Sequence, residues 1–179
     1  MKKLNPKSPD SFLDKGADMS LAKFGHLNAI VDGLNKKNIV SGSGATVTLR
    51  EDQSDSLIVL DRAAGIVITL PPAKVGLSFQ VVATVSVTSP NAYKVITANS
   101  STFLAGSYAN YDTDTTSAAN ATQFFAGNGS THVSVSMNGG TTGGLAGTNL
   151  KFTCISSTQW LVEGVNLGSG AVLSAFATS

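Results

Sequence analysis

The chain has 179 residues with 12 basic and 11 acidic side chains, so its formal net charge is +1, and it contains one cysteine. A domain of about 150 residues buries close to 70% of its unfolded surface, so this length suits one compact domain plus an appendage. The near-neutral charge argues against nucleic acid or an anionic membrane as partner, and a lone Cys154 excludes an internal disulfide framework or a cysteine-based metal cluster.

Neither a secretory signal nor a membrane span is expected. Residues 1–12 contain lysines, but no apolar run of about 7 to 15 residues follows them. No stretch approaches the roughly 20 apolar residues that cross a bilayer. These features predict a soluble protein that is made in the cytosol.

The charges are distributed unevenly along the chain. Residues 1–40 carry seven lysines and four aspartates, whereas the remaining 139 residues carry only five basic and seven acidic side chains. Such a break in composition marks a boundary between modules, and the Ser-Gly-Ser-Gly stretch at 41–44 is typical of a flexible linker. We therefore predict an N-terminal anchoring arm over 1–40, a linker over 41–44 and a second domain over 45–179.

An amphipathic helix is predicted over 20–37. Ser20 suits the N-cap, and Lys36 and Lys37 suit the last turn, where they oppose the helix dipole. Its apolar stripe, with side chains at helical spacing, consists of Leu21, Phe24, Leu27, Ile30, Val31 and Leu34. An isolated helix of this length is marginal in water, so the stripe needs a partner surface. That surface could belong to the second domain, to sister copies in a helical bundle or to another protein, and the charged flanks and flexible linker favour an outward docking arm.

From residue 45 onward, short runs of β-branched and apolar residues alternate with Gly, Ser, Asn and Asp. Period-two alternation is visible in residues 132–137, where Val133, Val135 and Met137 share one face. The runs that predict strands are 46–50, 57–61, 66–70, 77–87, 93–98, 133–137, 150–155 and 160–165. Evenly spaced short strands without helical periodicity predict a mainly β protein, with a β-sandwich or jelly-roll-like domain after the helical arm.

Two connections in this domain have clear sequence signals. Residues 156–159 separate two strand-like runs and predict a hairpin. Residues 139–147, GGTTGGLAG, hold five glycines in nine positions and predict a loop, which is either a mobile tip or a place where backbones approach closely.

The sequence offers little catalytic chemistry. His26 and His132 have no Cys, Asp or Glu at metal-ligand spacing, and no Gly-x-Ser-x-Gly or phosphate-binding loop pattern occurs. Asp112 and Asp114 alternate with hydroxyl residues as calcium ligands can, but without the glycine and distal glutamate of a known calcium loop a solvated loop is preferred. We therefore expect a protein that is not an enzyme and that uses no cofactor and no metal.

Aromatic residues and the cysteine have structural interpretations. Phe103, Tyr108 and Tyr111 could stack on sugar rings, although packing in the core or at a subunit interface is favoured. Cys154 alternates with Phe152 and is predicted to be a small buried apolar side chain.

Three segments of the β domain carry a family resemblance. They are residues 68–79 (ITLPPAKVGLSF), 93–97 (YKVIT) and 159–164 (QWLVEG), within a span of about 57–167. In this order they resemble small structural proteins of tailed-bacteriophage virions, the capsid decoration (cement) and head-fibre type. Related patterns occur in tail and fibre proteins.

The resemblance implies a non-enzymatic protein of the virion, made in the cytoplasm of the bacterial host. Its expected partner is the major capsid protein, bound through the N-terminal arm, and the expected assembly is a homo-oligomer, often a trimer, on the capsid surface. The stripe of the predicted helix would then supply the capsid or oligomer contacts. The alternative is a tail or fibre module that binds a host receptor or glycan through loops near 108–116 and 139–147.

Overall fold

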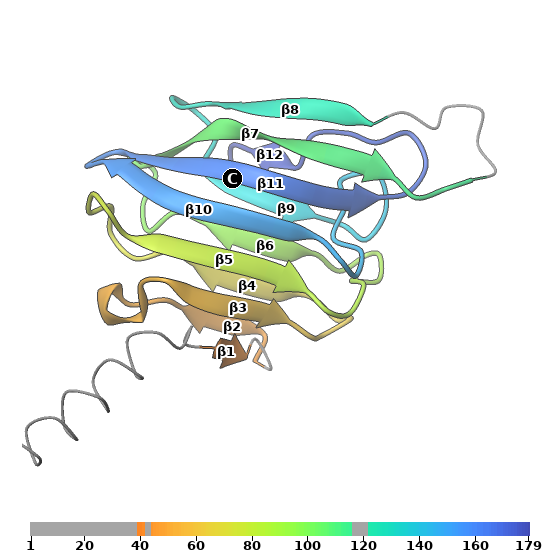
Figure 1. The fold of residues 1–179 in the computed structure, drawn as a ribbon, viewed down its shortest axis with the longest axis horizontal. Coiled ribbons are helices and arrows are strands. Elements are labelled where there is room, and N and C mark those ends of the chain that lie inside the picture. The colour runs from red at the N-terminus through yellow and green to blue at the C-terminus, as the bar shows by residue number, and fades with distance from the viewer. Residues whose placement is uncertain (1–38, 42–43, 116–121) are drawn as a thin grey trace, which may run out of the picture. The chain divides into compact units, whose positions relative to one another are not determined.

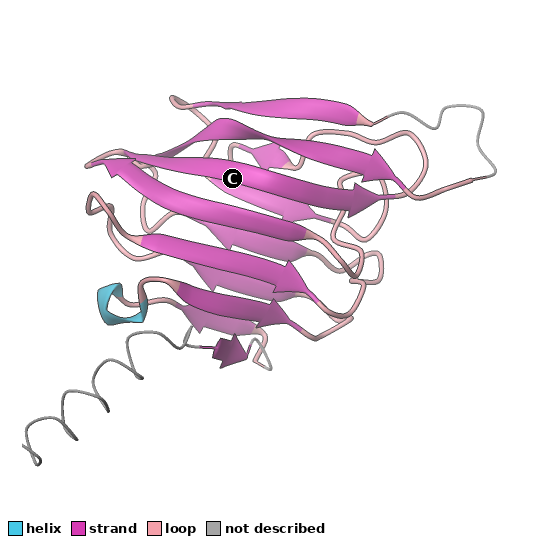
Figure 2. Ribbon diagram, viewed as in Figure 1, coloured by secondary structure: helices cyan, strands magenta, loops and turns pink. Residues whose placement is uncertain are grey.

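The computed structural model describes residues 39–41, 44–115 and 122–179. The chain divides into two units, residues 1–37 and 38–179. The helix predicted over 20–37, and with it the helical arm, lies outside the described residues. The second unit is mainly β, as predicted, and its described part contains one short helix, the 3-10 turn η2 (Glu51–Gln53), drawn cyan in Figure 2.

The strands form two mixed sheets that lie as two layers in Figure 1. Sheet A has the spatial order β1 (Ile39–Ser41), β3 (Ser56–Leu60), β5 (Ser78–Ala83), β10 (Asn149–Ser156), β11 (Gln159–Gly168), β7 (Phe103–Asp112) and β8 (Gln123–Asn128). Sheet B has the order β12 (Phe176–Ala177), β9 (Ser134–Met137), β6 (Tyr93–Ile96), β4 (Ile66–Thr69) and β2 (Thr46–Thr48).

Each of the eight predicted runs contains or overlaps a strand, but the sequence analysis missed four strands. β1 lies where the predicted arm (1–40) meets the predicted linker (41–44). Sheet A therefore begins at Ile39, within the segment that was predicted to be the arm. β7 (FLAGSYANYD) and β8 (QFFAGN) are rich in Ala, Gly and Asn, which have low strand propensity. These two segments become strands through pairing with neighbours that are distant in sequence or connected by a long loop.

The first six strands alternate between the two sheets. β1, β3 and β5 belong to sheet A, while β2, β4 and β6 belong to sheet B. Because each strand returns to its sheet after one passage through the other, it runs parallel to its predecessor, as the pairs β1–β3, β3–β5, β2–β4 and β4–β6 do. This winding produces the parallel pairs that make the two sheets mixed. The sequence pattern alone, short strands joined by turns, is equally compatible with consecutive antiparallel hairpins.

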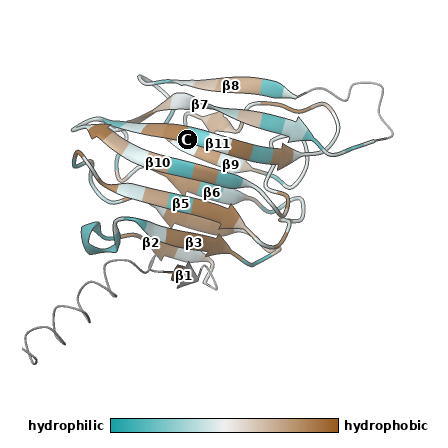
Figure 3. Cartoon of the chain, viewed as in Figure 1, coloured by the Kyte–Doolittle hydropathy of each residue, from teal (hydrophilic) through white to brown (hydrophobic). Residues whose placement is uncertain are grey.

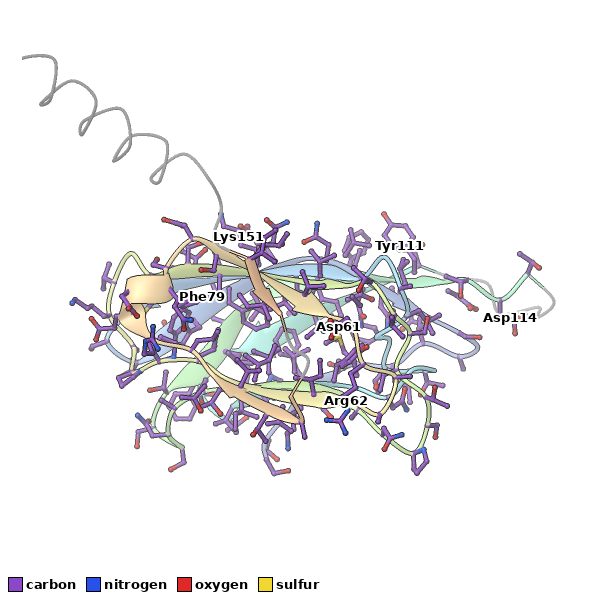
Figure 4. The ribbon with its side chains drawn as sticks, turned by 90° about the horizontal axis from the view of Figure 1, so that it is seen from below. Asp61, Arg62, Phe79, Tyr111, Asp114 and Lys151 are labelled. Atoms are coloured by element: carbon purple, nitrogen blue, oxygen red, sulfur yellow. The ribbon has the colours of Figure 1, made fainter. Side chains whose placement is uncertain are left out.

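A single apolar core fills the space between the sheets. Along β3, β5 and β10, buried residues alternate with more exposed ones, so each strand presents one face to the core. Phe79 of β5 and Trp160 of β11 are fully buried, with ring centroids 6.0 Å apart, and Figure 4 shows Phe79 between the layers. Sheet B contributes Ile66, Ile68, Tyr93, Val95, Val135 and Met137.

The hairpin predicted at residues 156–159 is confirmed. β10 and β11 pair antiparallel, with Cys154 opposite Trp160 and a register shift between Cys154 and Ser156. Gly164 in β11 has φ +136°, and a Cβ there would collide with the carbonyl oxygen of Asn149 on β10. The glycine that ends the QWLVEG segment is therefore required by a close backbone approach.

Removal of the Phe79 ring tests the core. Phe79→Ala should lower the free energy of unfolding by about 3–5 kcal/mol, because it leaves a cavity against Trp160. Gln80→Ala, one residue later on the opposite face, should change it by less than about 0.5 kcal/mol. Chemical denaturation followed by circular dichroism measures both, and equal losses would contradict this assignment of faces.

Candidate functional site

The residues predicted to contact a capsid or a sister copy lie outside the described residues. Leu21, Phe24, Leu27, Ile30, Val31 and Leu34 all belong to the segment 1–38. The candidate surfaces below are therefore those of the β domain alone.

Ionisable groups of the described segments form exposed surface pairs. Arg50 Nε lies 3.0 Å from Asp52 Oδ1, Lys74 Nζ lies 2.7 Å from Glu51 Oε2, and Lys151 Nζ lies 3.5 Å from Glu163 Oε1. The hydrogen bond from Arg50 lowers the pKa of the Asp52 carboxyl. Within residues 39–41, 44–115 and 122–179, no group of three or more His, Cys, Asp or Glu side chains is placed to hold a metal ion.

Three further clear pKa shifts belong to buried core residues. Burial raises the pKa of the Cys154 thiol, and it raises the pKa of the Tyr93 and Tyr108 phenols. Cys154 is 1% exposed, which confirms the prediction of a buried apolar cysteine. His132 accepts the Asn128 N–H at Nδ1 and stacks on Phe176, so it is a satisfied histidine, as expected.

The three aromatic residues considered for sugar stacking do not form a cluster. Tyr108 is 1% exposed and packs in the core against Phe176 and Phe125, so the core interpretation is confirmed for this residue. Phe103 and Tyr111 lie near opposite ends of the ten-residue strand β7. The hypothesis that these three residues together form a sugar-binding platform is therefore wrong.

The glycine-rich segment 139–147 is a loop held by two fully buried asparagines. Asn166 Oδ1 accepts hydrogen bonds from the Gly144 N–H and the Thr148 hydroxyl, and its Nδ2 donates to the Thr142 carbonyl. Asn110 Nδ2 donates to the carbonyls of Thr141 and Leu173.

Close backbone approach explains the glycines of this loop. Gly139 has φ +76°, and a Cβ there would collide with the carbonyl oxygen of Val87, while a Cβ at Gly143, with φ +84°, would collide with the Asn166 side chain. Of the two expectations for the loop, close approach is confirmed.

Asp112, considered as a calcium ligand, has a structural role at the end of β7. Its Oδ1 accepts the N–H groups of Asp114 and Gly170 at 2.8 and 3.0 Å. The carboxylate thus ties the chain after β7 to the chain after β11, which is a turn-forming role.

A hollow of about 330 Å³ lies beside β6 and β9. Lys94, Ile96, Thr97, Asn99, Val133 and Thr178 are among its lining residues. Lys94 is the one charged side chain among these lining residues, and most of the lining surface is apolar.

The outward surfaces of the two sheets differ in chemistry. Eight large apolar side chains of the described chain are exposed, and five of them point outward from sheet A: Ile39, Tyr111, Phe124, Ile155 and Val165. The other three, Val75, Val85 and Leu173, lie in loops. Sheet B presents Thr46, Thr48, Thr69 and Ser136, together with Val67, Lys94 and Ile96, none of which is among the exposed large apolar side chains. In Figure 4, Lys151 and Tyr111 of sheet A point away from the core on the same side.

Register places several apolar residues of sheet A in one row, which the polar Asn149 interrupts. This row, together with the other outward residues of the sheet, is named the outer face of sheet A. Successive ladder partners from β3 to β8 are Val59, Val82, Asn149, Val165, Ala109 and Phe124. Figure 3 shows hydrophobic segments on β3, β5 and the C-terminal end of β11. The sequence analysis missed this surface because β7 and β8 were not predicted; the one signal was the absence of Lys, Arg, Asp and Glu from residues 115–150.

Comparison of the chain with protein-family models, with curated proteins and with solved structures found no match. Among the described residues, no helix has the length and apolar character needed to cross a membrane.

Replacement of Asn166 tests the role of the asparagines. Asn166→Ala should lower the free energy of unfolding by about 2–4 kcal/mol, because the buried Gly144 N–H and Thr142 carbonyl lose their partner. Asn149→Ala, which removes an exposed amide bonded to Gln80, should cost less than about 0.5 kcal/mol. Thermal and chemical denaturation compare the two variants, and a mild effect of Asn166→Ala would show that the loop does not depend on this side chain.

The buried thiol and phenols predict a loss of stability at alkaline pH. Their raised pKa values favour the protonated folded state, so their contribution is complete below the ordinary values of 9.0 for cysteine and 10.0 for tyrosine. It is lost as the pH rises through the folded-state values. Denaturation midpoints should therefore fall above about pH 9, and Cys154→Ala should reduce the fall. An unchanged pH profile in this variant would contradict a thiol contribution.

Proposed function

We propose that this protein is a structural component of a tailed-bacteriophage virion, most specifically a capsid decoration (cement) protein or a short head fibre. The N-terminal arm, predicted over residues 1–40 but ending before β1 begins at Ile39, binds the lattice of the major capsid protein. The β domain, as a β-sandwich module, covers or projects from the capsid surface. The motifs in residues 68–79, 93–97 and 159–164 support this proposal.

One observation about the β domain carries the proposal beyond the resemblance. The outer face of sheet A presents a row of apolar side chains with only one cation and one anion, Lys151 and Glu163, among the outward residues of its strands. Few ions need to lose their hydration when such a surface is covered, which suits a protein that packs closely with neighbours.

The proposed action is mechanical. A cement protein that contacts neighbouring capsomers adds interfaces that internal DNA pressure must break before the shell opens. Repetition on a lattice supplies avidity, so each arm can bind modestly while the shell remains coated.

Capsid binding tests the arm. A chain that begins at Asn38 keeps β1, which pairs with β3, and should fold but lose co-sedimentation with capsids of the cognate phage. In the full chain, Val31→Asp places a charge on the predicted apolar stripe and should reduce binding about tenfold or more. Ala29→Asp, which introduces the same charge on the side of the predicted helix that faces away from the stripe, should bind as the wild type does.

Two outcomes would contradict the proposal. Undiminished capsid binding by the chain that begins at Asn38 would refute the arm assignment. Failure of the wild-type chain to bind capsids, while it binds host-cell glycans, would favour the tail or fibre alternative.

A further inference from the structure

We propose that the outer face of sheet A is the surface through which copies of this chain pack against one another. The inference deepens the proposed virion role by naming a second copy as the partner of the β domain. It rests on that role because a coat protein is present in many copies, but association of the purified chain can be measured without capsids.

The apolar row crosses nearly the whole sheet. Phe124 on β8 is 78% exposed, Val165 on β11 is 36% exposed, and Ile39 on β1 is 65% exposed in the neighbouring row beside Leu57. Successive side chains of a strand point to opposite faces of the sheet, and ladder partners point to the same face. The buried neighbours in the strand, or the outward ladder partners, therefore show that these side chains point outward. Several exposed apolar side chains on one face of a sheet are typical of a surface that contacts a partner.

The size of this face matches a specific interface. Seven strands at about 4.8 Å spacing extend about 29 Å, and four outward rows about 6.7 Å apart extend about 20 Å. The flat area is about 600 Å², to which side-chain relief adds, against about 800 Å² that each partner contributes to a standard interface.

The charges on this face suit a second copy of the same chain. Lys151 and Glu163 are ladder partners, are about half exposed and form an ion pair, so the face as a whole is neutral. Two neutral copies meet without net repulsion, whereas a strongly charged partner would find no complementary field. The same surface on both copies is the usual arrangement in symmetric homo-oligomers.

The edge strand β8 supports the same partner. Proteins protect a free sheet edge with lysine, proline or inward-pointing charge, yet β8 has the sequence QFFAGN and contains none of these. Its neighbour β7 pairs on one side, and the opposite edge carries no further strand of sheet A among the described residues. A second copy that covers Phe124 would also shield this edge from uncontrolled association.

An outward valine on sheet B provides a control position for substitutions on sheet A. Val67 lies on β4, the second strand from one edge of that sheet, points outward and has Thr46 and Lys94 as ladder partners. A valine can therefore be changed to glutamate at an outward strand position on either face. The two changes introduce the same charge, but only the change on sheet A lies in the proposed interface.

The experiment measures the mass of the full chain by light scattering and sedimentation across a concentration series. The wild type should be an oligomer, and Val165→Glu should weaken association about a hundredfold or more, because burial of an unpaired carboxylate is costly. Val67→Glu should retain the wild-type mass. Phe124→Ser, which adds no charge and removes a side chain that lies largely in solvent, should weaken association in the same direction, with circular dichroism confirming that every variant is folded.

Three outcomes would overturn the inference. They are a wild-type chain that is monomeric at every concentration, a Val165→Glu variant with the wild-type mass, and equal dissociation by Val165→Glu and Val67→Glu. An oligomer that survives Val165→Glu but disappears when the chain begins at Asn38 would assign association to residues 1–37 instead. Capsid binding is measured separately. A wild-type chain that forms the oligomer but does not bind capsids would refute the proposed function and leave this inference standing.

Discussion

Burial of one apolar core between two sheets is the constraint on which the rest of this structure depends. Each sheet has one face that alternate side chains make apolar, and neither sheet could bury that face alone. Phe79 and Trp160 on sheet A meet the apolar residues of sheet B across the layer. The first six strands alternate between the two layers, so both sheets form around the same core and their successive strands pair in parallel.

The same alternation determines which side chains reach the outside. The inward positions are mainly apolar on both sheets, and the sheets differ in their most exposed apolar side chains, which lie on sheet A at Ile39, Tyr111, Phe124, Ile155 and Val165. A domain that needed only to remain dissolved would gain nothing from this difference. The exposed apolar side chains make the outer face of sheet A the more suitable of the two for contact with a partner.

Buried amides organise one end of the domain. Asn110 and Asn166 are ladder partners on β7 and β11, and both are fully buried. Their hydrogen bonds to the carbonyls of Thr141 and Thr142 help to hold the glycine-rich loop, together with backbone hydrogen bonds such as that from the Leu145 N–H to the Leu167 carbonyl. A loop with five glycines is therefore ordered in part by side chains that come from elsewhere in the sequence.

The sequence by itself determined the features that depend on local periodicity and turn chemistry. These are the mainly β character, the eight strand-like runs, the hairpin between β10 and β11, and the buried environment of Cys154, because alternation and turn residues act over a few positions. Only the tertiary structure decided that Tyr108 belongs to the core, that β7 and β8 are strands, and that Val59, Val82, Val165 and Phe124 lie on one surface. Each of these depends on pairing between segments far apart in the chain or on register across several strands, and a shift of one residue would move every side chain to the other face.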